Sequence, residues 1–117
     1  MKFLVLALAT LALAVSAQLQ HNGAWGTRGP QDVLLFRENV VAKSKWLRVN
    51  KVDLSYPQRG QNGGTITAIN VYDGSTNGKG GYAKIKAGGV GQNNVTIRFK
   101  SQRGKAMNFT VEIYGQK

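Results

Sequence analysis

The feature that most constrains the fold is a period-two alternation of apolar and polar residues in the C-terminal half of the chain. From Asn94 to Lys100, valine, isoleucine and phenylalanine alternate with polar or charged residues. The pattern recurs from Met107 to Tyr114 and, more weakly, from Tyr82 to Ala87. Successive side chains of a β-strand point to opposite faces, so the alternation is typical of strands with one buried and one solvated face.

Short connections between these segments indicate how the strands pair. The two connections, residues 88–93 and 101–106, are polar and contain glycine. Neither is long enough to hold a crossover helix between parallel strands. Neighbouring strands are therefore expected to pair antiparallel.

Further strands are expected earlier in the chain. Residues 32–41 form a mostly apolar run in which Leu35 breaks strict alternation, and a strand or extended segment is favoured there over a short helix capped by Asp32. Residues 65–72 are β-branched at nearly every other position. Residues 46–56 change the phase of their alternation half-way, which predicts a β-bulge or a bend between two sheets. With glycine-rich turns between the runs, the sequence predicts an all-β fold, a small antiparallel sandwich or barrel of about six to seven strands.

The N-terminus has the three parts of a secretory signal peptide. Met1-Lys2 is basic, residues 3–15 are apolar, and Val15-Ser16-Ala17 offers small or aliphatic residues to a signal peptidase. We predict a signal peptide over residues 1–17 and a secreted, extracellular protein. The apolar run is shorter than the roughly 20 residues that span a bilayer, and no later stretch is long and apolar enough, so no membrane span is predicted.

The chain after the signal peptide has room for one domain. Residues 18–31 contain several glycines and Pro30, which predicts an irregular N-terminal arm, and residues 32–117 are predicted to form a single β domain. Trp25 is expected to pin the arm onto that domain. His21, the single histidine, is expected to face solvent on a mobile segment.

The residue types argue against catalysis. The chain has no cysteine, which excludes thiol chemistry and cysteine metal sites, and its five carboxylates are scattered. Residues 78–83 match G-x-G-x-x-A, but a strand pattern follows where nucleotide binding needs a helix. We predict a non-enzyme with no catalytic residue, no metal site and no cofactor.

The strongest functional indication is charge. Sixteen basic residues face five acidic ones, for a formal net charge of +11. This imbalance favours a polyanionic partner, such as a sulfated glycan or nucleic acid, an anionic membrane surface or an acidic protein. The alternative is that the charge only keeps the protein soluble.

Part of this charge is expected on one sheet face. If the strands near residues 82–87 and 94–100 pair, their polar sides place four cations together, and two more follow in the next loop. These predicted polyanion-binding residues are Lys84, Lys86, Arg98, Lys100, Arg103 and Lys105. Such a face, with tyrosine beside it, can hold single-stranded nucleic acid or a sulfated glycan, although exposed lysines also suppress edge-to-edge aggregation.

Two N-glycosylation sequons accompany the export signal. They begin at Asn94 and Asn108, and neither has proline at its middle position. Both asparagines are expected on the polar sides of their strands. A glycan on Asn94 would crowd the basic face.

The order of several motifs resembles that of a known insect family. The motifs are Asp32-Val33-Leu34-Leu35, Asp53-Leu54-Ser55-Tyr56-Pro57, Ile69-Asn70-Val71-Tyr72-Asp73, Gly80-Gly81-Tyr82-Ala83, Gly88-Gly89-Val90-Gly91-Gln92, Ser101-Gln102-Arg103-Gly104 and Phe109-Thr110-Val111-Glu112-Ile113-Tyr114-Gly115. Together they resemble the multiprotein bridging factor two (transcription activator) family, which includes small salivary secreted peptides. The resemblance implies an insect secretory setting and salivary expression. Its alternative implication is a transcriptional co-activator that bridges a DNA-binding regulator and the general machinery.

Overall fold

The computed structural model describes residues 20–117, and the predicted signal peptide lies outside the described residues. The predicted all-β class is confirmed, because this part of the chain contains seven strands and no helix. None of it therefore forms a helix suited to crossing a membrane. The strands are β1 (Gly23–Gly26), β2 (Val33–Ala42), β3 (Lys51–Tyr56), β4 (Thr65–Asp73), β5 (Tyr82–Gly88), β6 (Val95–Lys100) and β7 (Met107–Gln116).

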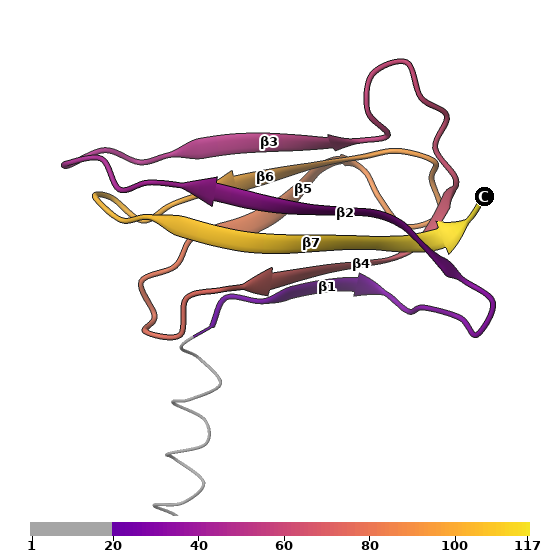
Figure 1. Ribbon diagram of the computed structural model, residues 1–117, viewed down its shortest axis with the longest axis horizontal. Helices are drawn as coiled ribbons and strands as arrows, with labels where there is room; N and C mark the ends of the chain where they lie inside the picture. Colours follow the sequence, from indigo (N-terminus) through magenta and orange to yellow (C-terminus); the bar gives the residue numbers. More distant parts are fainter. Residues whose placement is uncertain (1–19) are drawn as a thin grey trace, which may run out of the picture.

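The strands form two antiparallel sheets that face each other (Figure 1). One sheet has the order β1-β4-β7-β2 and the other β3-β6-β5. All paired strands are antiparallel, as the short connections predicted. Of the two predicted architectures, the fold is the sandwich.

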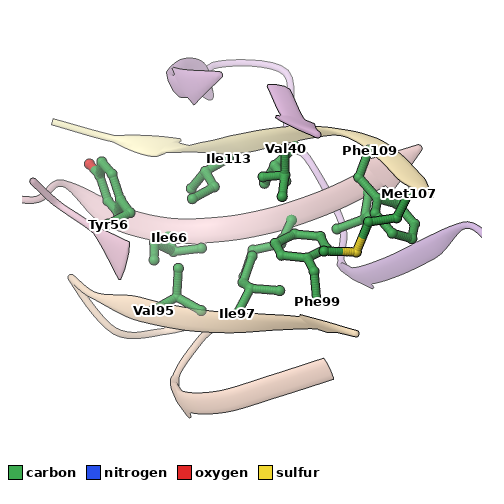
Figure 2. Close-up of a cluster of buried hydrophobic side chains, with 12 residues drawn as sticks. Val40, Tyr56, Ile66, Val95, Ile97, Phe99, Met107, Phe109 and Ile113 are labelled. Carbon is green, nitrogen blue, oxygen red and sulfur yellow. The ribbon is translucent and has the colours of Figure 1, made fainter. Parts of the chain in front are cut away.

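The core lies between the sheets and is built by the alternating residues. Val95, Ile97 and Phe99 of β6 are almost fully buried, and they face Phe109 and other side chains of the larger sheet (Figure 2). The rings of Phe99 and Phe109 lie 5.1 Å apart between centroids, with a tilt of 40°. The apolar residues of the period-two pattern therefore lie on the buried side of each sheet, and the polar residues lie on its outer side.

The apolar run in β2 contains an irregularity that its sequence suggested. The pairing of β2 with β7 shifts register between Leu34 and Phe36. This bulge leaves Leu35 without a direct partner and turns its side chain against the core. Leu35 therefore interrupts the alternation without ending the strand.

The prediction of one bulged strand over residues 46–56 is wrong in its first half. Strand β3 begins only at Lys51, and a tight turn precedes it. Arg48 N donates a hydrogen bond to Lys45 O over 3.1 Å, and Leu47 between them has a φ of 57°. The alternation changes phase within residues 46–56 because the first part of this segment is a turn and only the second part is a strand.

The prediction of an irregular arm is wrong for residues 23–26, which form β1 at the edge of the larger sheet. Trp25 pairs with Ile69 of β4 and packs against the core. Its predicted anchoring role is confirmed. Because the arm is part of a sheet, His21 is held in place as well.

A buried carboxylate fixes the connection between β1 and β2. Asp32 accepts hydrogen bonds from Gly29 N, from Thr67 Oγ1 over 2.7 Å and from Gln116 Nε2 over 3.3 Å. These bonds, the one from Gly29 above all, lower the pKa of Asp32. The connection is thereby tied to β4 and β7.

Candidate polyanion-binding face

The outer side of the β3-β6-β5 sheet gathers most of the cations that the sequence singled out. Lys51, Lys100 and Tyr82 lie side by side across the three strands, and Asp53, Arg98 and Lys84 form the next row. Lys86 lies at a bulge of β5, where the register shifts between Ile85 and Ala87. We call the exposed residues Lys51, Lys84, Lys86 and Lys100 the lysine face.

Neighbouring side chains of this face are close enough to share one extended ligand. Adjacent strands lie about 5 Å apart, and two residues along a strand span about 7 Å. None of the four lysines forms an ion pair within residues 20–117. The lysine face therefore presents an unneutralised positive surface.

Arg98 is on this face, but its charge is already neutralised. Its Nε donates to Asp53 Oδ1 over 2.8 Å and its Nη2 donates to Asp53 Oδ2 over 3.0 Å. This pairing lowers the pKa of Asp53 and raises the pKa of Arg98. Lys86 and Lys51 also lower the pKa of Asp53 through their charges, as their place on the same face requires.

Arg103 and Lys105 lie off the sheet face, in the connection between β6 and β7. Arg103 Nη1 donates to Leu47 O over 3.1 Å, which joins this connection to the turn before β3. The two residues extend the positive surface around the end of the sandwich. They do not continue the rows of the lysine face.

The N-terminal arm contributes an aromatic contact that sequence reasoning missed. The His21 ring stacks on Tyr82, with centroids 4.4 Å apart and planes 14° from parallel. His21 N donates to Asp73 Oδ2 and its ring Nδ1 donates to Gly81 O, each over 2.9 Å. The prediction that His21 faces solvent is wrong: its side chain is only 19% exposed, because the pairing of β1 with β4 brings the arm against β5. Tyr82 is 55% exposed, so its other ring face remains open beside Lys100.

Both sequon asparagines are exposed. Asn94 directly precedes β6, and its Nδ2 donates to Asn93 Oδ1 over 3.0 Å. It lies six positions before Lys100, which corresponds to about 20 Å along an extended strand. A glycan there would stand at the far end of the face from Tyr82. Asn108 lies on the outer side of the other sheet, opposite Val41.

A second surface of the described residues is apolar, and no metal site accompanies it. A groove between the edges β1 and β5 is lined by Trp25, Ile69, Ile85 and Val90 and is mainly apolar. Across residues 20–117, no three histidine or acidic side chains gather as metal ligands would.

Comparison with known proteins supports the motif resemblance. A family model described as "Transcription activator MBF2" matches residues 25–115. The chain belongs to this family. A relative from Bombus ignitus, named "Probable salivary secreted peptide", is 43% identical over 96 residues, which cover 82% of this chain and 70% of the relative. No solved structure matches the chain. The matched region of the MBF2 family runs from β1 into β7 and includes the whole lysine face.

Proposed function

We propose that the chain is a small, secreted, basic, non-enzymatic protein of insect saliva or body fluid that binds a polyanion on its lysine face. The observation that carries this proposal is the gathering of four cations without ion-pair partners on one sheet face, within residues 20–117. The name of the Bombus relative supports secretion into saliva. The signal-like N-terminus of this chain points the same way.

A sulfated glycan fits this face better than a single-stranded nucleic acid does. The surface is a sheet with lysine ammonium groups, which attract an anion from many directions. On this face Tyr82 provides one platform for a base, since the other exposed tyrosine of the described residues, Tyr72, belongs to the other sheet. Proteins that hold single strands stack successive bases on several aromatic rings. A flexible chain of sulfated sugars needs spaced cations and no series of rings.

Retention on a heparin column tests the proposal. The triple variant Lys84→Gln/Lys86→Gln/Lys100→Gln should elute at much lower salt than the wild type. Log affinity falls with log salt concentration, and the loss of about three ionic contacts should make this fall less steep by about two to three. Isothermal titration with a heparin oligosaccharide at several salt concentrations would measure that slope.

A matched control separates a site from diffuse charge. The variant Arg59→Gln/Lys79→Gln/Lys117→Gln loses three charges from exposed positions outside the lysine face, and none of the three forms an ion pair within residues 20–117. It should keep most of the wild-type retention. Equal losses in the two variants would overturn the proposed site and leave only non-specific attraction.

Removal of Asp53 should have the opposite effect on binding. The variant Asp53→Asn removes the carboxylate that neutralises Arg98 and leaves its guanidinium free to contact the ligand. Heparin retention should increase, and the affinity should fall with salt more steeply, by the amount expected for about one added ionic contact. The exposed acid Glu38, on the other sheet, gives the control Glu38→Gln with the same change in net charge. If both variants gain equally, the Asp53–Arg98 pair does not limit binding.

The family name favours a second candidate function, a transcriptional co-activator acting through protein contacts. Expression of residues 1–117 in insect cells would separate the two. Secretion predicts recovery from the medium with Gln18 at the new N-terminus. An uncleaved precursor retained in the nucleus would favour the co-activator.

A further inference from the structure

The turn between β2 and β3 exposes two large apolar side chains at adjacent positions. Trp46 is 86% exposed and Leu47 is 56% exposed. In Figure 1 this connection projects beyond the neighbouring ends of the strands. Two adjacent apolar side chains this exposed on a projecting turn form a candidate contact surface.

Hydrogen bonds hold this turn in a defined shape. Arg48 N donates to Lys45 O over 3.1 Å, which closes the turn around Trp46 and Leu47. Leu47 has a φ of 57°, a conformation that favours glycine or asparagine over a branched side chain. We call residues 45–48 the Trp46 turn.

The facing connection between β6 and β7 braces the same turn. Arg103 Nη1 donates to Leu47 O over 3.1 Å, and Gly104 N donates to Arg48 O over 2.7 Å. At the base of the loop, the buried Asn50 donates from its Nδ2 to Lys43 O over 2.8 Å. The two apolar side chains are therefore presented on a supported backbone.

Five cations belong to the two connections that meet at this turn. Those of the two facing connections are Lys43, Lys45, Arg48, Arg103 and Lys105, and all five are exposed. The sequence has no acidic residue between Glu38 and Asp53, nor between Asp73 and Glu112. An apolar tip in a region rich in cations and poor in acids is complementary to a surface with an apolar interior and a negative boundary.

We propose that the Trp46 turn inserts into the interface of an anionic phospholipid membrane. Tryptophan is favoured at the boundary between headgroups and acyl chains, and Leu47 can follow it into the apolar layer. The lysine and arginine stems can lie along this layer while their charges contact phosphates and carboxylates. This proposal does not rest on the lysine face, which occupies different residues.

The shape of the site favours a membrane over a folded protein partner. A stable protein interface buries about 800 Å² on each partner. Two apolar side chains on one projecting turn provide only a small part of that area. Shallow insertion into a bilayer needs no matching pocket.

Vesicle flotation of the secreted protein tests the proposal. Vesicles of phosphatidylcholine with about 30% phosphatidylserine are compared with pure phosphatidylcholine vesicles at about 0.15 M salt. Binding to the anionic vesicles should be at least about 100-fold tighter, since each cation near the surface adds to the attraction. Equal binding to both vesicles, or no binding to either, would overturn the proposal. The second result would point to a protein partner for the turn.

A variant that keeps every charge tests the insertion itself. Trp46→Ser/Leu47→Asn removes the apolar tip, and asparagine tolerates the positive φ at residue 47. Its partition into anionic vesicles should fall at least about tenfold, whereas its heparin retention should be unchanged. The control Val33→Ser/Val90→Ser alters two exposed apolar residues elsewhere and should bind vesicles like the wild type. Unchanged partition of the Trp46 variant would mean that charge alone binds the vesicle.

Fluorescence gives a reading that charge alone would not change. In a Trp25→Phe background, Trp46 is the single indole of the chain. Its emission should move to shorter wavelength when anionic vesicles are added, because the ring leaves water. The lysine-face triple variant should retain this shift even though it loses heparin binding. Emission that stays at the solvent-exposed wavelength with bound vesicles would rule out insertion.

Discussion

Phe109→Ala is expected to lower the free energy of unfolding by about 4 kcal/mol. The Phe109 side chain is fully buried and packs on Phe99 across the two sheets (Figure 2). Truncation to alanine removes buried apolar area and leaves a cavity that the rigid sheets cannot fill. A domain of this size is stable by only about 5–15 kcal/mol, and this one has no disulfide to limit the unfolded state. Urea denaturation followed by circular dichroism would measure the loss.

The neighbouring exposed residue provides a control for this substitution. Asn108→Ala, on the solvated side of the same strand, should change the free energy of unfolding by less than about 0.5 kcal/mol. A double-mutant cycle with Phe99→Leu and Phe109→Leu should give a coupling energy of about 0.5–1.5 kcal/mol for the ring pair. Zero coupling together with a small loss in Phe109→Ala would contradict the core described here.

Local patterns were sufficient to predict the strands that build this core. The alternation of Val95, Ile97 and Phe99 requires only that side chains of a strand point to opposite faces. Residues 65–72 and 107–114 carry the same local information, and their strands are confirmed. The period-two pattern of a half-buried sheet is visible in the sequence without knowledge of partners.

Elements that depend on distant partners were not predictable in this way. Strand β1 contains two glycines and has only four residues, and its existence depends on pairing with β4. The Trp46 turn contains leucine at a positive φ, where sequence rules expect glycine or asparagine. Tertiary contacts from Arg103 and Gly104 support that turn, and their position is not a local property of the sequence.

The candidate site was likewise predictable only in the part that depends on local sequence patterns. The shared phase of Lys84, Lys86, Arg98 and Lys100 placed them on one face once their strands paired. The pairing of β3 with β6 was not predictable, and it brings Lys51 onto the face and Asp53 against Arg98. Lys51 and Asp53 are two residues apart and therefore point to the same side of β3. This shared side places them on the lysine face only when the strand next to β3 is known.

Gly115→Ala is expected to cost about 3 kcal/mol of stability, although it adds only one methyl group. Gly115 is buried in the central strand β7, between Val33 of β2 and Ile66 of β4. A Cβ at this position would overlap the carbonyl oxygen of Thr65 and lie 2.9 Å from the Leu35 side chain. The carbonyl belongs to the paired strand β4, so relief would require displacing that strand.

Two further variants distinguish this backbone overlap from other effects of replacing glycine. Gly60→Ala has no atom within 4 Å of the added Cβ, but its φ is 84°, so it should cost only about 1 kcal/mol. Leu35→Ala combined with Gly115→Ala should not restore stability, because the overlap with the Thr65 carbonyl remains. Recovery in the double variant would show that side-chain crowding, rather than the approach of β4, requires glycine here. Thermal or urea denaturation of the three variants against the wild type would decide between the two causes.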